Sequence, residues 1–282
     1  MPSKDSALGR LLRTPRAVFG ATVLLLVCLC AMFADGLIPF DPEDMDFENL
    51  LGEASLAHPF GTDQLGRDTL TRLILGARVA MQVSVGAVGL GVAVGVPLGL
   101  VAAMIGRWTD DLVMRVMDAV VVFPSLLVAV ALAAALGSSL GTVILAIGIA
   151  NVPWLARITR SQALTLRELD FVLAAEAAGT SRTMVMLRHI LPNSMAPIIV
   201  QTTLGMGYAV LTEAALGFIG VGVQPPTPTW GNMLQQAFPL LDRQPLLSVV
   251  PGVAIFVLVL AFNLLGDALR DVLDPRLRGV VR

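Results

Sequence analysis

The sequence predicts an all-α protein that spans a membrane with six helices. Of its 282 residues, 56% are hydrophobic and 14% are charged, whereas soluble domains usually contain about 25% charged residues. Mean hydropathy is +0.80. Apolar runs of the length needed to cross a hydrocarbon core, about 20 residues each, recur along the chain. These observations predict an integral membrane protein with little aqueous domain.

The predicted spans cover residues 17–35, 79–105, 117–137, 141–156, 195–217 and 247–267. The first span follows a basic stretch, as the apolar part of a signal peptide would. Its apolar run is longer than the roughly 7–15 residues of a signal sequence, and it ends in Asp35 and Gly36 rather than in a small-residue cleavage site. We therefore expect a retained span in which Cys28 and Cys30 face lipid instead of forming a disulfide.

The distribution of basic residues predicts the orientation of the chain. Most of the 19 Lys and Arg residues lie in the two termini, in the connection after the second span and in residues 157–193. Because basic residues accumulate in cytoplasmic segments, we expect all of these parts in the cytoplasm. The predicted layout is a cytoplasmic tail 1–16, a first span 17–35, an extracytoplasmic segment 36–78, a five-helix core 79–267 and a cytoplasmic tail 268–282.

The extracytoplasmic segment begins with acidic residues and ends with an amphipathic pattern. Residues 67–78 (RDTLTRLILGAR) predict a helix that lies on the membrane surface. The acidic run DPEDMD, residues 41–46, lacks the glycine and the terminal glutamate of a calcium-binding loop. We interpret this run as a solvated loop.

Glycine and proline punctuate the second and third spans. Gly91, Gly95 and Gly99 recur at intervals of four residues, a spacing that lets two helices approach closely in lipid. Pro97 in the same span predicts a kink. A hinge in a moving span is the alternative, and close packing is favoured. In the third span, Phe123-Pro124 predicts an early interruption of the helix.

The fifth span contains an ionisable residue, Glu213. At a rise of about 1.5 Å per residue, it lies near the outer end of the span rather than at the midplane. Two interpretations remain open: a residue of the pathway or its gate, and a structural carboxylate at the interface. The loop 220–232 that follows contains three prolines, which favour an extended path. Trp230 is expected to be an interfacial anchor.

Motifs for common enzymatic chemistry are absent from the sequence. It contains no phosphate-binding G-x-x-x-x-G-K-[ST] loop, no H-E-x-x-H and no G-x-S-x-G element. The only histidines, His58 and His189, lie on opposite sides in the predicted topology and could not share a metal ion. An intramembrane hydrolase is therefore unsupported, because no pair of nucleophile and base is visible.

The longest polar island between spans is the segment 157–193. It contains Arg157, Arg160, Arg167, Arg182 and Arg188. A short Ala-rich helix is predicted over 169–178, followed by a glycine suited to a left-handed cap. Thr180 or Ser181 can cap the next helix. Such a short helix either inserts into a groove of a partner or is an ordinary surface helix, and the pattern alone does not separate these alternatives.

A family resemblance separates them. The segment FVLAAEAAGTSRTMVMLRHILPN (171–193) resembles the cytoplasmic "EAA" loop of membrane subunits of ABC-type importers. Leu173 stands where this family usually has glutamate, and Glu176 lies three residues later. Residues 58–78, 211–234 and 261–278 are similar to the second permease of dipeptide, oligopeptide and nickel importers. The positions that match the loop pattern are Ala174, Ala175, Gly179, Leu191 and Pro192.

The resemblance implies a type I ABC importer permease fold with six transmembrane helices and a cytoplasmic coupling helix, in a bacterial or archaeal cytoplasmic membrane. It implies a non-enzymatic half of a translocation pathway, most often for a di- or oligopeptide. The implied partners are a sister permease, two cytoplasmic ATPases and an extracytoplasmic substrate-binding protein. ATP and Mg would be used by the ATPases, and this chain would bind no cofactor itself. The alternative function is a proton-coupled secondary carrier with Glu213 as its coupling group.

The residues that the resemblance assigns to contact with an ATPase are Phe171, Ala174, Ala175, Glu176, Gly179, Thr180, Ser181, Arg182, Leu191 and Pro192.

Overall fold

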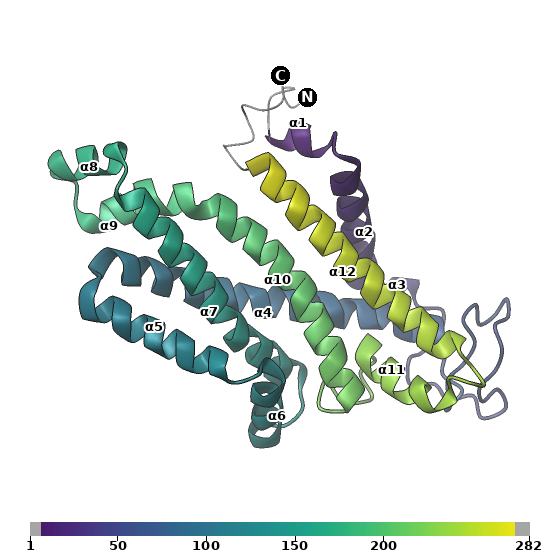
Figure 1. Ribbon diagram of the computed structural model, residues 1–282. Coiled ribbons are helices and arrows are strands. Elements are labelled where there is room, and N and C mark those ends of the chain that lie inside the picture. Colours follow the sequence, from purple (N-terminus) through teal and green to yellow (C-terminus); the bar gives the residue numbers. More distant parts are fainter. Residues whose placement is uncertain (1–6, 274–282) are drawn as a thin grey trace.

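The computed structural model describes residues 7–273, and this part of the chain is helical with no strand beyond one isolated bridge between Thr62 and Asp68. Figure 1 shows the arrangement of the helices. The predicted tails 1–16 and 268–282 lie partly outside the described residues. The helices are α1 (Ala7–Leu11), α2 (Pro15–Met32), α3 (Ala34–Leu37), α4 (Thr69–Ile105), α5 (Arg107–Val122), α6 (Ser125–Leu136), α7 (Leu140–Arg167), α8 (Asp170–Ala177), α9 (Arg182–Val185), the π-helix η1 (Met186–Ile190), α10 (Leu191–Ile219), α11 (Trp230–Ala237), the 3₁₀ turn η2 (Phe238–Leu240) and α12 (Leu246–Leu273).

Five of these helical segments are long and apolar enough to cross a membrane. They are α2, α4, α7, α12 and the segment from α9 to the end of α10. A sixth span is formed if α5 and α6 are counted as one, although their axes are bent by 84° at the break between them. The break falls at Phe123 and Pro124, as predicted. Phe123 is extended (ψ 125°), which is the conformation that a following proline favours.

The fourth span is longer than predicted. The sequence favours a short span over 141–156, whereas α7 continues to Arg167. The added turns remain helical because Ala163 and Leu164 pack into a buried cluster with residues of α4 and α10. The polar side chains that suggested a loop lie on the remaining faces of this helix. They alternate with the apolar residues in the sequence, so the apolar face was hard to recognise.

Helices α4 and α7 pack against each other at backbone distance. A Cβ atom placed on Gly95 would lie 2.6 Å from the carbonyl oxygen of Val152 and 3.0 Å from the Cβ atom of Leu155. At Gly99 it would collide with the carbonyl oxygen of Ala156, and at Gly91 it would lie 3.0 Å from the Cβ atom of Asn151. The three glycines therefore form a contact face, which confirms the close-packing interpretation of their spacing.

The remaining long helices lie side by side on the other flank of α4. In Figure 1, α10, α12 and α2 follow one another, and α8 and α11 lie at opposite ends of the molecule. A Cβ atom on Gly20 of α2 would lie 2.8 Å from the carbonyl oxygen of Ala261 in α12, so these two helices are also in close contact. Arg10 of α1 donates a hydrogen bond to the carbonyl oxygen of Val272 (3.1 Å), which joins α1 to the end of α12.

The prediction of a separate surface helix over 67–78 is wrong. Residues 69–78 are the first turns of the continuous helix α4, and Asp68 caps it by accepting a hydrogen bond from the Thr71 amide (2.7 Å). Arg72 on these turns is buried. Its guanidinium lies 3.6 Å from Asp63 and donates a hydrogen bond to the side-chain oxygen of Gln236 (3.4 Å). The basic residue that suggested a wet face is thus enclosed by partners from distant segments.

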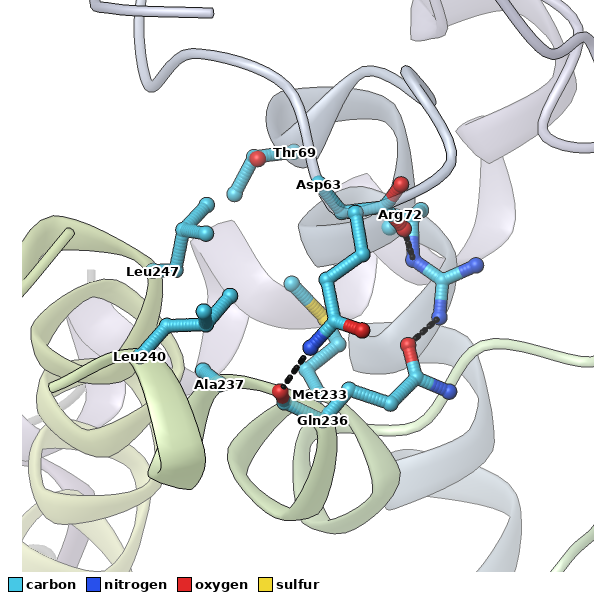
Figure 2. A pocket seen from close by; sticks show the side chains of 9 residues that line it. Asp63, Thr69, Arg72, Met233, Gln236, Ala237, Leu240 and Leu247 are labelled. Carbon is cyan, nitrogen blue, oxygen red and sulfur yellow. Dashed lines mark hydrogen bonds and ion pairs between the residues drawn. The ribbon is translucent and has the colours of Figure 1, made fainter. Parts of the chain in front are cut away.

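A small pocket borders this buried arginine. Figure 2 shows Arg72 between Asp63 and Gln236, with Leu240 and Leu247 across the pocket. The cavity measures only about 20 Å³, which is space for a single water molecule. The pocket is therefore a packing feature and not a solute site.

A further correction concerns Trp230, which is not an interfacial anchor. Its side chain is 3% exposed and donates a hydrogen bond from Nε1 to the carbonyl oxygen of Leu73 (3.0 Å). The indole lies against Gly76, where a Cβ atom would come within 2.5 Å of the ring. Trp230 therefore fastens α11 to α4.

A glycine substitution tests the contact between α4 and α7. We expect Gly95→Ala to lower the thermal midpoint of the detergent-solubilised protein, because the added methyl group meets a backbone carbonyl that cannot rotate away. Overpacking of this kind costs about 1–3 kcal/mol. Gly89→Ala in the same helix is the matched control, since no atom lies within 4 Å of the added carbon. Equal thermal midpoints for the two variants would contradict the proposed contact.

Candidate functional site

The predicted coupling segment forms a short helix that ends in a defined turn. Helix α8 covers Asp170–Ala177, against a predicted range of 169–178. Gly179 has φ +84°. Its amide donates to the carbonyl of Glu176 (2.9 Å), and the Thr180 amide donates to the carbonyl of Ala175 (3.1 Å). This pair of hydrogen bonds is the Schellman motif, in which a left-handed residue closes a helix. The predicted glycine cap is confirmed.

The next segment returns to the long helix α10 through a π-helical turn. Ser181 caps α9 by accepting a hydrogen bond from the Met184 amide (3.4 Å), so Ser181 rather than Thr180 is the capping residue. Pro192 lies in the first turn of α10, as predicted. Next to it, the Asn193 side chain donates to the carbonyl of His189 (2.6 Å). This side-chain hydrogen bond lies where the π-helical turn passes into α10.

Helix α8 is both exposed and firmly held. Figure 1 shows it at one end of the molecule, beyond the ends of α7 and α10. Val172 is fully buried in a cluster with Val185, Ile190, Leu155 and Ala103. The rest of α8 is open, and its exposed residues include Phe171, Leu173, Ala174, Glu176 and Ala177. A helix anchored by one face and open on the other is suited to dock into a partner.

Polar side chains line a cleft beside α8. The cleft measures about 370 Å³ and is lined by Met104, Ile105, Arg167, Glu176, Thr180 and Arg182. Arg167 donates to the carbonyl oxygen of Ala103 (2.8 Å), which ties the end of α7 to the end of α4. Glu176 therefore shares this cleft with two arginines, while Leu173 is an exposed apolar residue.

Two of the five arginines in the segment 157–193 form ion pairs with α5 and lie away from α8. Arg160 forms an ion pair with Asp110 through both carboxylate oxygens, and Arg157 pairs with Asp118 (2.6 Å). Both pairs link α7 to α5. Part of the positive charge of this segment therefore stabilises the packing of α7 against α5.

Glu213 is buried where α10 meets α11. Its side chain is 1% exposed, and its Oε1 atom has no hydrogen-bond partner among the described residues. Thr229, which lies close to the carboxyl group, caps α11 by accepting a hydrogen bond from the Asn232 amide (3.1 Å). Gly217 and Gly231 bring the two helices together beside it, since a Cβ atom on Gly217 would lie 3.0 Å from the Gly231 backbone and one on Gly231 would lie 2.5 Å from the carbonyl oxygen of Ala214. This location favours a structural carboxylate, and the role itself remains a prediction.

The histidines lie far apart in the fold. His58 hydrogen-bonds to Asp68 (3.0 Å) at the end of the molecule that carries α11, whereas His189 lies 6.4 Å from the Phe171 ring beside α8. Within residues 7–273 we find no group of three or more His, Cys, Asp or Glu side chains placed to hold a metal ion.

Sequence reasoning missed the ion-pair cluster that holds the extramembrane segment. Arg78 donates to both carboxylate oxygens of Asp35 (2.9 Å each), and this hydrogen bonding lowers the pKa of Asp35. Arg67 bridges Asp63 (2.7 Å) and Gln236 (3.2 Å). The only local signal was the spacing of Asp63 and Arg67 by four residues, while Gln236 is too distant in sequence to be recognised.

The fold defines a multi-pass membrane protein with a short, exposed and anchored helix at one end. Comparison with known proteins agrees and is more specific. Residues 95–279 match the family described as "Binding-protein-dependent transport system inner membrane component", and residues 5–59 match the "N-terminal TM domain of oligopeptide transport permease C". The chain belongs to this family of ABC importer permeases, whose members work with separate ATPase and substrate-binding partners.

Curated relatives are similar over nearly the whole chain. The dipeptide transport system permease protein DppC of Alkalihalophilus pseudofirmus is 43% identical over 272 residues, which is 96% of this chain and 90% of the relative. The glutathione transport system permease protein GsiD of Escherichia coli is 42% identical over 271 residues, or 96% of this chain and 89% of the relative. The chain is thus a permease subunit of an importer and not an enzyme.

Solved structures support the fold assignment. An inward-facing structure of the MetNI methionine ABC transporter superposes with a TM-score of 0.60 at 16% identity, covering 72% of this chain and 97% of that chain. A second crystal form gives a TM-score of 0.59 at 17% identity, covering 73% and 98%. At this identity the likeness shows the fold alone, and it confirms the predicted type I ABC importer permease fold.

Two substitutions of Glu213 test whether it is structural. We expect Glu213→Gln to fold and to transport within about twofold of the wild type, because glutamine keeps the size and the polar end of the side chain at this buried position. Glu213→Leu puts a branched apolar side chain into the closely packed contact between α10 and α11 and should destabilise the protein by about 1–3 kcal/mol. Thermal unfolding and vesicle uptake measure both effects. A correctly assembled Glu213→Gln variant that transports nothing would instead assign the residue to the pathway.

Proposed function

We propose that the chain forms one half of the translocation pathway of an ATP-driven importer for a di- or oligopeptide. The observation that carries the proposal is α8, a short helix anchored through Val172 and closed by Gly179 while its outer face stays open. The dipeptide and glutathione permeases that resemble the chain support a peptide-like solute.

The proposed assembly follows from this docking element. The end of the molecule with α8 faces the cytoplasm, together with both termini, and the end with α11 faces outward. A sister permease supplies the other half of the pathway, two ATPases bind ATP and Mg, and an extracytoplasmic protein delivers the solute. The proposed location is the cytoplasmic membrane of a bacterium or archaeon. The contacts with the ATPase are assigned to Phe171, Ala174, Ala175, Glu176, Gly179, Thr180, Ser181, Arg182, Leu191 and Pro192.

The packing of α8 explains how closure of an ATPase would move the spans. Val172 contacts a cluster that includes Val96 of α4, Ala163 of α7 and Ile198 of α10. Protein interiors are close-packed, so a displaced helix takes its packed neighbours with it. Movement of α8 is therefore expected to reach three spans at once.

The experiment that tests the function separates it from a proton-coupled carrier. The chain is co-expressed with its neighbouring permease, ATPase and binding-protein subunits, and uptake of labelled dialanine is measured in vesicles. We expect co-purification of an ATPase and uptake that requires ATP. Uptake that persists in ATP-depleted, energised vesicles, with no ATPase recovered, would refute the importer and favour the carrier.

Two substitutions at Gly179 test the turn after α8. We expect Gly179→Val to reduce ATP-driven uptake about tenfold or more, because a residue with φ +84° is strained when it carries a branched side chain. Gly179→Asn is the control and should stay within about twofold, since asparagine adopts left-handed conformations. No atom lies within 4 Å of the added carbon, so the two variants differ in backbone strain and not in collision. Normal uptake by the valine variant would remove the turn from the mechanism.

A further inference from the structure

A pair of hydroxyl groups lies at the break between α5 and α6, which together form one bent candidate span. Tyr208 is the only tyrosine of the chain, and its side chain on α10 is 53% exposed. Its hydroxyl lies 3.4 Å from the hydroxyl of Ser125. Ser125 is the first residue of α6 and follows directly on the break at Phe123 and Pro124. The pair therefore joins α10 to the point where α5 ends.

The position of Tyr208 along α10 is unusual for an exposed polar group. Helix α10 covers Leu191–Ile219, so at about 1.5 Å per residue Tyr208 lies roughly 26 Å from its start and 17 Å from its end. It is thus inside the span and not at an interface, where tyrosine is commonly found. A polar group at this depth faces protein or a water-filled cavity.

The broken helix is a second and independent indication of water at the same point. A helix end leaves its last four carbonyl groups without partners in the helix. Irregular backbone at membrane depth is tolerated where it is enclosed by protein or lines a water-filled cavity. Phe123 and Pro124 are both exposed in the single chain, so the break opens away from this chain's own core.

The side chains on this face of α10 indicate the chemistry that it can contact. Between Leu191 and Ile219 the only charged residue is Glu213, which is buried. Gln201 lies two turns before Tyr208 on the same face and is partly exposed. Together with Ser125 of α6, the polar groups on this face are therefore the amide of Gln201 and two hydroxyls. They both donate and accept hydrogen bonds without carrying charge.

We infer that Tyr208 and Ser125, at the broken span, line the solute pathway and hydrogen-bond to the uncharged amide groups of a passing solute. The inference rests on the proposed function, because it assigns residues to the pathway of that importer. Neutral donors and acceptors suit a passage, since a solute must leave each contact as readily as it enters. The competing arrangement is a helix of the sister permease packed over the same pair.

Cysteine accessibility tests the location. The chain has only Cys28 and Cys30, so a cysteine-free background needs two substitutions to serine. Tyr208→Cys in the assembled transporter is treated with a membrane-impermeant methanethiosulfonate reagent. Phe256→Cys is the control, because Phe256 is a similarly exposed but apolar position on α12. We expect modification at position 208 to be at least about tenfold faster, since the reagent reaches a thiol only through water.

Conservative substitutions test the hydrogen bonds. We expect Tyr208→Phe and Ser125→Ala each to raise the KM for dialanine uptake about threefold to tenfold, the factor for a lost hydrogen bond. Substrate-stimulated ATP hydrolysis should show the same shift in KM. Equal reagent rates at positions 208 and 256, or cross-linking of Tyr208→Cys to the sister subunit without reagent access, would overturn the inference. If the wild-type assembly fails to use ATP, the proposed function fails, while the accessibility result is read independently.

Discussion

The backbone contact between α4 and α7 is the constraint on which the rest of the structure depends. Lipid offers no hydrophobic drive for helices to associate, so close approach through small residues supplies the packing. Gly91, Gly95 and Gly99 allow it, and each faces backbone or Cβ atoms of α7. Because α4 is continuous from Thr69 to Ile105, it joins the buried ion pairs beside α11 to the cluster under α8. The same helix therefore fixes the positions of both ends of the molecule.

Helix α8 depends on this frame in two ways. Its buried residue Val172 packs against side chains that α4 and α7 position together. Its exit through Gly179 and the π-helical turn leads into α10, which lies along α4 and α12. A displacement of α8 can therefore be transmitted to the spans in two ways: through the packed side chains around Val172, and through the backbone that leads into α10. The ion pairs from α7 to Asp110 and Asp118 extend the same body to α5.

The sequence predicted those features that local residues determine. The turn at Gly179 and the break at Pro124 follow from backbone preferences of single residues, and both are confirmed. The surface helix and the anchoring role of Trp230 were wrong because their partners lie far away in sequence. Arg72 is enclosed by Gln236, and Trp230 by the first turns of α4. A basic or amphipathic residue is predicted to be solvent-exposed unless a distant segment is known to cover it. Sequence periodicity does not show which distant segments make contact.

The two polar residues of α10 that could take part in transport, Tyr208 and Glu213, lie on different faces of the helix. Tyr208 and Glu213 are five residues apart, which at about 100° per residue turns their side chains some 140° away from each other. Glu213 faces α11, where Thr229 and two glycines leave no access for water or solute. Tyr208 faces the broken span and is open. A group that couples proton flow must reach water, and of these two residues only Tyr208 is exposed. The burial of the carboxylate therefore favours a structural role beside α11, and the exposed hydroxyl of Tyr208 lies on the opposite face of the same helix.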